Sequence, residues 1–229
     1  MILSTYQPYF APFPGFFYKA HHSDIFVLLD TVQFPRGTTW ISRNRFKNDQ
    51  GCLWLTIPVW KKGLGLQSID AVRICHEGQW ARKLLASLEH AYSHAPYFDD
   101  HADFIRKLFD SRIERLADFN TQIIQYLMRV LNVDTQLRLM SQTGIRHSGI
   151  LLLIELCRHF GATTYLAQRS AAHYLDETAF NNAGIRLQFF SPSAPIYPQL
   201  WGEYIANLST LDLVFNCGPK ALDILLDLT

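Results

Sequence analysis

Arg43, Arg45 and Lys47 stand at alternate positions in a segment that alternates apolar and polar residues. As a strand, this segment would carry the three cationic side chains on one face. Like charges at this spacing repel one another, so such a row persists as a solvated face or where an anion or carboxylate balances it. Polar and aromatic residues that suit a phosphate joined to a polar organic group stand nearby, namely Asp30, Gln33, Trp40 and Asn44. The segment therefore predicts an anion site, with a solvated basic face as the alternative.

The stretch from Pro35 to Lys62 is basic, whereas the whole chain is nearly neutral. It holds six basic residues against one acid, Asp49, while all 229 residues together carry a net charge of +1. A nucleic-acid-binding surface needs a broad positive field, which this composition does not provide. We therefore expect a small anionic partner, such as a nucleotide-sugar or an activated acyl donor, and no nucleic acid.

The composition indicates a folded protein without a membrane segment. Hydrophobic residues make up 48% of the chain and aromatic residues 14%, which is enough for a sizeable core. The sequence shows neither a signal-peptide pattern nor a run of about 18 apolar residues. Its four cysteines lack a Cys-x-x-Cys spacing and fit a reducing compartment. We expect a cytoplasmic protein that makes no membrane contact, and the sequence is compatible with an oligomer.

The first thirty residues predict a strand, loop, helix and strand in succession. Ile2 to Tyr6 has the pattern of a short strand, Gln7 to Phe17 that of a loop entering a helix, and Asp24 to Asp30 that of a strand covered on both faces. Open α/β sheets bind ligands at the carboxyl ends of their strands. The residues expected at that edge are Gln7, Tyr9 and Asp30.

The remaining patterns predict a single α/β domain over residues 1–229, with a mixed sheet. A β-meander is expected after the first βαβ unit, from the strand patterns Ile41–Phe46, Cys52–Trp60 and Ile69–Cys75. Between about 79 and 133, apolar residues recur at helical spacing and predict a helical insertion of about three helices. The last hundred residues return to strands and helices, with Ser209 as the expected cap of the final helical region.

Several segments, in order, resemble the WbqC-like protein family over nearly the whole chain. They read QPYFAPFPGFFYKAHHSDIFVLLDTVQF, WISRNRFK, WLTIPV, GATTYLAQRSAAHYLDETAFNNAGI, and YPQL followed by LSTLDLVFNCGPKAL. The loop before Gly15 departs from the family pattern, which usually has a proline-tryptophan pair there. The resemblance implies a role in bacterial O-antigen-type glycan synthesis, with transfer of a glycyl or other acyl group to an amino-sugar. The site positions that it implies are Gln7, Pro8, Tyr9, Asp30, Gln33, Arg43, Asn44, Arg45, Tyr174, Gln199, Asp212, Asn216 and Gly218.

Arginine and carboxylate chemistry suits such a transfer. Arginine forks make bidentate contacts with phosphate or carboxylate, so Arg43 and Arg45 are predicted to clamp the anionic group of the substrate. An amine acceptor must lose a proton, and Asp30 is the nearest candidate base; the alternative is that Asp30 only pairs with one of the two arginines.

For other polar residues, the sequence leaves binding and structural roles open. Gln7 and Gln33 could hydrogen-bond a sugar hydroxyl or an acyl amide, or cap backbone groups of the proline-rich loop. Asn216 could bind substrate or only support a helix stop at Gly218. Cys217 is a candidate nucleophile, with a buried structural role as the alternative, since no local signature gives it a histidine partner.

Standard metal and nucleotide motifs do not occur. His90 and His94 share a helical face but do not form an HExxH motif, so no metal site is predicted. The Gly63–Ser68 segment lacks the third glycine of a dinucleotide fingerprint, and there is no GxxxxGK[ST] loop. The sequence leaves any cofactor undefined.

These observations predict an acyl or aminoacyl transferase that acts on an amino-sugar or nucleotide-sugar. The alternative is a non-catalytic module that binds a nucleotide-sugar or another phosphate ligand. The predicted catalytic residues are Asp30 and Cys217, and the predicted substrate-binding residues are Gln7, Tyr9, Gln33, Trp40, Arg43, Asn44, Arg45, Lys47, Tyr174, Gln199 and Asn216.

Overall fold

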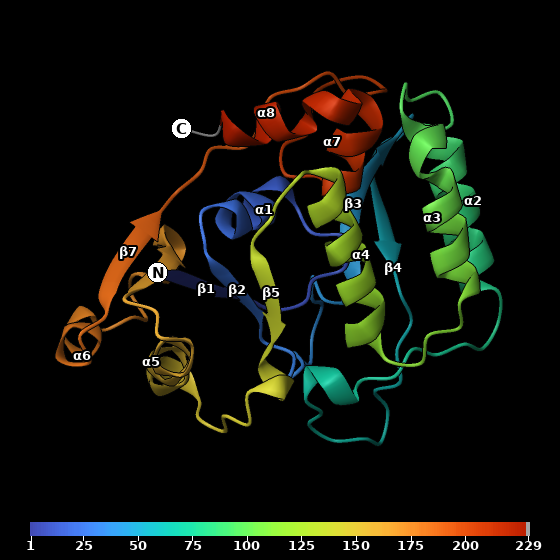
Figure 1. The fold of residues 1–229 in the computed structure, drawn as a ribbon. Helices are drawn as coiled ribbons and strands as arrows, with labels where there is room; N and C mark the ends of the chain where they lie inside the picture. The colour runs from blue at the N-terminus through green and yellow to red at the C-terminus, as the bar shows by residue number, and fades with distance from the viewer. Residues whose placement is uncertain (228–229) are drawn as a thin grey trace.

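Five parallel strands form the central sheet of the computed structural model, which describes residues 1–227 (Figure 1). Their order is β5-β2-β1-β6-β7. All four residues of β2 are buried, because helices cover both faces of a parallel sheet. The predicted α/β class is confirmed, and residues 228–229 lie outside the described part. The strands are β1 (Ile2–Tyr6), β2 (Ile25–Leu28), β5 (Gln136–Leu139), β6 (Thr164–Gln168) and β7 (Arg186–Phe190).

Helices cover the two faces of the sheet separately. On one face, α1 (Pro14–His21) packs Phe16 and Phe17 into a core with Phe26 of β2. On the other face, α5 (Gly149–Phe160) and α6 (Glu177–Asn182) contribute to a second core, which contains Leu3 of β1. Pro14 fits the first turn of α1, where its missing N–H is not needed, and Gly161 ends α5 in the left-handed conformation with φ 70°.

The strand order reverses between β1 and β6. From β1 the chain crosses through α1 to β2 on one side, and from β6 it crosses through α6 to β7 on the other side. The two connections therefore diverge at the carboxyl ends of β1 and β6. Such a reversal leaves a crevice at the edge of an open α/β sheet, and ligands of this fold class bind there.

The basic segment forms an antiparallel hairpin beside the main sheet. It consists of β3 (Arg43–Asn48) and β4 (Gly51–Thr56), with Arg45 opposite Trp54. The mixed sheet thus divides into a parallel sheet and this separate two-stranded sheet. The third meander strand, predicted over Ile69–Cys75, does not form. Instead, Ile69–Ala71 is a 3-10 helix, and Ile74 makes only an isolated bridge to Val59. Ile69 and Val72 are both fully buried at a spacing of three, which a helical turn satisfies and a strand does not.

Three helices occupy the region where helical spacing predicts them: α2 (Trp80–Tyr92), α3 (Phe98–Asp110) and α4 (Leu116–Val130). They lie beside the hairpin, with α2 and α3 side by side at the edge of the molecule (Figure 1). The chain closes with α7 (Thr210–Cys217) and α8 (Ala221–Leu226). Ser209 caps α7 as expected, because its hydroxyl accepts a hydrogen bond from Leu211 N at 3.2 Å. Among residues 1–227, no helix has the length and apolar character needed to span a bilayer.

Candidate functional site

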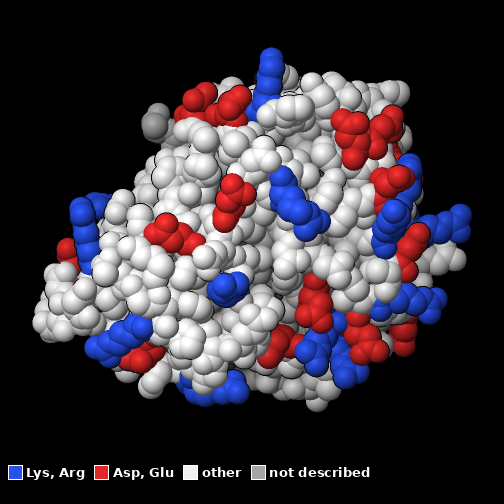
Figure 2. Space-filling model, in the orientation of Figure 1, with Lys and Arg blue, Asp and Glu red and all other residues white. Residues whose placement is uncertain are grey.

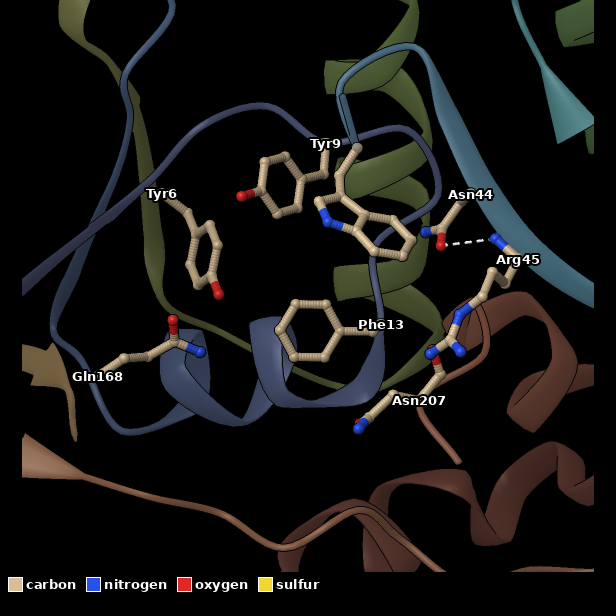
Figure 3. A pocket seen from close by; sticks show the side chains of 8 residues that line it. Tyr6, Tyr9, Phe13, Asn44, Arg45, Gln168 and Asn207 are labelled. Atoms are coloured by element: carbon tan, nitrogen blue, oxygen red, sulfur yellow. Dashed lines mark hydrogen bonds between the residues drawn. The ribbon is translucent and has the colours of Figure 1, made fainter. Parts of the chain in front are cut away.

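A pocket of about 310 Å³ opens where the strand order reverses (Figure 3). Tyr6, the last residue of β1, and Gln168, the last residue of β6, place the sheet edge in its wall. Phe13 enters from the start of α1, and the hairpin and the segment before α7 supply the remaining wall. The residues that line the pocket are Tyr6, Tyr9, Phe13, Trp40, Asn44, Arg45, Gln168 and Asn207.

Aromatic rings give the pocket its apolar surface. Tyr6 packs edge-on against Tyr9, with ring centroids 5.3 Å apart, and against Phe13 at 6.2 Å. Burial raises the pKa of the Tyr6 and Tyr9 hydroxyls, so both remain neutral and able to donate and accept hydrogen bonds. The amide of Gln168 lies beside the Tyr6 hydroxyl (Figure 3). This surface suits a ring with one apolar face and several hydroxyl groups.

Arg45 is the cation of the pocket lining. Its guanidinium donates to the carbonyl oxygens of Ala206 and Asn207, both at 3.1 Å, and lies 5.8 Å from the centre of the Trp40 ring. None of the ion pairs within residues 1–227 includes Arg45. Its Nε is buried without a hydrogen-bond partner. A fixed guanidinium with no carboxylate beside it can accept the anionic group of a ligand.

Asn44 lines the pocket, as predicted for a ligand contact, and its side chain also makes structural hydrogen bonds. Its amide donates to the carbonyl oxygens of Phe10 and Ala11, at 2.9 and 2.6 Å, and its oxygen accepts from Arg45 N at 2.7 Å. Ala11 has a φ of 42°, a conformation that side-chain-bearing residues rarely adopt. Asn44 therefore holds the loop that carries Tyr9 and Phe13 toward the pocket.

The three cationic side chains of the predicted row each lie in a different environment. The pairing of β3 with β4 confirms that Arg43, Arg45 and Lys47 alternate with inward residues, but only Arg45 lines the pocket. The Arg43 guanidinium lies 3.7 Å from the centre of the Trp54 ring. Lys47 is buried and donates to Gln199 Oε1 at 3.2 Å. Of the two arginines predicted to clamp the anionic group, only Arg45 lines the pocket, and Lys47 lies outside the lining.

The geometry also corrects the role predicted for Asp30 as a base beside the arginines. Its buried carboxylate accepts hydrogen bonds from Ser141 N at 2.8 Å and Ser141 Oγ at 2.5 Å. Asp30 therefore joins the end of β2 to the segment after β5, outside the pocket lining. It pairs with neither Arg43 nor Arg45, so the alternative weighed from sequence is also wrong. Gln33 is exposed and lines a different hollow near the start of α5, and Gln7 is half-buried outside the pocket lining.

None of the four predicted C-terminal site residues lines the pocket: Asn216 and Cys217 belong to the last turn of α7, and Tyr174 and Gln199 precede that helix. Burial raises the pKa of the Cys217 thiol to about 11, which opposes a thiolate nucleophile. The Gln199 amide donates to the Ile205 carbonyl oxygen and accepts from Ile205 N. The Asn216 amide donates to the Asp212 carbonyl oxygen at 2.8 Å. Tyr174 is exposed, and it lies outside the pocket lining. In the structure Gln199 and Asn216 thus make hydrogen bonds within the protein, and the substrate-binding and catalytic roles expected for Gln199, Asn216 and Cys217 stay predictions.

Asp212 organises a buried hydrogen-bond cluster below the hairpin. It accepts from the hydroxyls of Tyr92, at 2.6 Å, and Tyr197, at 2.9 Å. The Tyr92 hydroxyl in turn accepts from Lys47 N at 2.9 Å, which ties α2 and α7 to β3. Burial raises the pKa of the Asp212 carboxyl, while the two tyrosine hydroxyls oppose that shift.

Sequence reasoning missed several pocket residues. Tyr6 and Gln168 are strand ends, and only the order of the strands shows that they face one another. Phe13 and Asn207 come from loops that the fold brings together from the two ends of the chain. Lys19, fully buried in α1, was also missed, although a lysine among apolar residues of a short helix is a signal that could have been noticed.

Charges of both signs are mixed on one face of the molecule. On the face seen in Figure 2, Lys and Arg are interspersed with Asp and Glu, without a field of one sign. Within residues 1–227, no three His, Cys, Asp or Glu side chains are grouped to hold a metal ion. His101 of α3 makes a hydrogen bond with the Tyr126 hydroxyl.

Comparisons with known proteins agree with the resemblance seen in the sequence. The model of the WbqC-like protein family matches residues 7–224. A relative from Mycobacterium tuberculosis, named Uncharacterized protein Rv1507c, is 32% identical over 222 residues, which is 96% of this chain and 95% of the relative. No solved structure matches the chain significantly.

Proposed function

Given that the chain belongs to the WbqC-like protein family, we propose that it is an acyl or aminoacyl transferase of the glycyl type. Its substrate would be an amino-sugar, carried as a nucleotide-sugar, in bacterial surface glycan synthesis of the O-antigen type or a related pathway. The observation that carries the proposal is the aromatic pocket at the reversal of the strand order, with Arg45 in its wall.

The pocket has a suitable group for each part of such a substrate. The Tyr6, Tyr9 and Phe13 rings offer flat apolar surface to a sugar ring, and the Gln168 amide offers hydrogen bonds to its hydroxyls. Arg45 offers charge-assisted hydrogen bonds to a phosphate oxygen. Together these groups would orient the sugar while its phosphate stays at the hairpin side.

The proposed reaction forms an amide on the sugar. The neutral amine attacks the carbonyl carbon of an activated acyl donor, the C–N bond forms, and the bond to the leaving group breaks with its electron pair. The amine gives up one proton in the process, and the anionic leaving group or solvent water takes it up. Holding the amine against the donor supplies much of the acceleration that such a bimolecular step needs.

A second function is a non-catalytic module that binds a nucleotide-sugar. The lining favours it in one respect: the pocket residues include no carboxylate, histidine or cysteine that could act as base or nucleophile. Binding without turnover would then be the whole activity of the site.

A matched pair of tryptophan variants tests the proposal. Trp40 lines the pocket and Trp60 does not, although their exposed fractions are similar, 41% and 43%. Purified protein would be given UDP-glucosamine and glycyl-CoA, and mass spectrometry would detect a glycyl amide. We expect product with the wild type and Trp60→Ala and at least about tenfold less with Trp40→Ala.

Calorimetry on the same three proteins separates the two functions. Binding of UDP-glucosamine without product would favour the binding module over the transferase. Equal losses in both tryptophan variants, or no binding by the wild type, would contradict the proposed pocket.

A further inference from the structure

A buried lysine with no acidic partner lies behind the pocket. Lys19 is 4% exposed, and its ammonium donates to the Thr5 carbonyl oxygen at 2.9 Å. It also lies 5.1 Å from the centre of the Tyr6 ring and 5.8 Å from that of Phe190. Aromatic faces attract a cation, but they compensate only part of the cost of removing an ammonium group from water.

The sheet register places this ammonium next to the pocket floor. Phe190 pairs with Gln168 across β7 and β6, and β6 lies between β7 and β1. Lys19 therefore contacts the strand ends on both sides of Gln168, while Tyr6 and Gln168 themselves line the pocket. Side chains of a helix lean toward its N-terminus, and α1 begins beside Phe13, so the lysine stem extends toward the pocket end of the sheet.

The protein supplies no negative charge for this ammonium within residues 1–227. Lys19 takes part in none of the ion pairs formed there. From β1 it meets the Tyr6 ring, whose hydroxyl stays neutral, and from β7 it meets the uncharged ring of Phe190. Helix α8 also packs on α1, but its acid, Asp223, is exposed to solvent.

Burial alone lowers the pKa of Lys19 to about 7. At neutral pH the lysine is therefore divided between its charged and neutral forms. A negative group brought into the pocket would favour the charged form strongly, because solvent does not screen charges separated by a protein wall as it does on the surface.

We propose that Lys19 is a second cation of the site, which lies behind the pocket wall, takes up a proton when the anionic group of a ligand binds, and then balances the charge of that group. The inference rests on the proposed function for the site but names a residue and a proton linkage that the transfer reaction does not require. The ligand class that it specifies is a small molecule with a phosphate or carboxylate group, which Arg45 contacts in the pocket and whose charge Lys19 balances from behind the Tyr6 ring.

The linkage has a definite direction with pH. Below about pH 7 Lys19 is already protonated in the free protein, so ligand binding takes up little. Above about pH 7 the free protein holds a neutral amine, so binding draws a proton from the buffer. Affinity for the anion should therefore fall as pH rises above about 7, by at most about tenfold per pH unit.

Titration calorimetry in buffers of different ionisation enthalpy measures this proton directly. The probe is UDP-N-acetylglucosamine, whose diphosphate keeps its charge near neutral pH. Near pH 8 we expect the wild type to take up between about half a proton and one proton on binding, and near pH 6 much less. Lys19→Met, which keeps an unbranched side chain, should bind more weakly and take up almost none.

Lys61→Met is the matched control. The Lys61 ammonium also meets a backbone carbonyl, Gly37 O at 3.3 Å, and an aromatic ring, Phe34 at 4.7 Å, but Lys61 is only half-buried and lies outside this pocket. This variant should keep the proton uptake of the wild type.

Each outcome of the calorimetry decides the inference. Binding without proton uptake, or equal uptake by Lys19→Met, overturns the role of Lys19 and leaves the proposed transferase standing. Proton uptake that depends on Lys19, in a protein that yields no transfer product, supports the inference and contradicts the proposed transferase activity. Absence of binding by the wild type overturns the anion site itself.

Discussion

Arg43 and Arg45 stand two residues apart on the same strand, yet only Arg45 faces the pocket. We predict that Arg45→Gln weakens binding of UDP-N-acetylglucosamine by about tenfold or more, because a charge-assisted contact is lost. Arg43→Gln, which removes a guanidinium stacked on Trp54, should change the dissociation constant less than about threefold. Fluorescence titration of the two variants checks this, and an equal loss in both would restore the two-arginine clamp.

Lys19 should also affect how the free energy of unfolding depends on pH when no ligand is bound. Its ordinary pKa of 10.5 in the unfolded chain lies above its folded value of about 7, so between these values the unfolded state holds more protons. The free energy of unfolding of the wild type should therefore rise relative to that of Lys19→Met as pH increases above about 7. The slope is at most about 1.4 kcal/mol per pH unit. Urea unfolding curves measure it, and a constant difference between the two proteins above that pH would contradict the burial argument.

The loop that carries Tyr9 and Phe13 depends on one amide of the hairpin. We predict that Asn44→Ala lowers the free energy of unfolding by about 2 to 3 kcal/mol, because the carbonyls of Phe10 and Ala11 lose their buried donor. Asn48→Ala is the control on the same strand, since Asn48 accepts only from Gln50 N at an exposed turn, and it should cost less than about 1 kcal/mol. Equal costs in urea unfolding would show that Asn44 does not hold the loop.

The junction between β2 and the segment after β5 depends on Asp30. We predict that Asp30→Asn destabilises the protein by about 1 to 3 kcal/mol, since the carboxylate accepts both bonds from Ser141. Affinity for UDP-N-acetylglucosamine should stay within about twofold of the wild type, because Asp30 lies outside the pocket lining. Unchanged stability together with lost transfer activity would instead support the catalytic base expected from the sequence.

Elements with a strong local pattern were predictable from the sequence. The buried run at β2, the helical spacing of α2 to α4 and the cap at Ser209 all depend on residues within a few positions of one another. The segment from Ile69 to Cys75 was predicted wrongly, because a short apolar run does not distinguish a strand from a turn of 3-10 helix. There the burial of Ile69 and Val72, set by distant neighbours, decided the conformation.

The candidate site was only partly predictable, because partners far apart in the chain decide each role. Tyr9, Trp40, Asn44 and Arg45 were predicted and do line the pocket. Lys47 looked like a free cation, but Gln199, 152 residues away, accepts its hydrogen bond. No local pattern could show that β1 and β6 pair with each other. This pairing is what brings Tyr6 opposite Gln168.

The whole molecule combines a parallel sheet with a hairpin and C-terminal helices that close over one end of it (Figure 1). The sheet supplies a crevice where its connections diverge, and the hairpin supplies the cation. The central claim is therefore that the ligand binds at the reversal of the strand order, between Tyr6 and Arg45, and not along the basic hairpin or in another hollow.

Indole NMR signals of the five tryptophans test this claim most directly. Titration with UDP-N-acetylglucosamine should shift the Trp40 indole N–H signal, assigned with Trp40→Phe, while the Trp60 signal stays in place, because only Trp40 lines the pocket. A shift of the Trp60 signal with an unmoved Trp40 signal, or saturable binding that leaves both unchanged, would contradict the account.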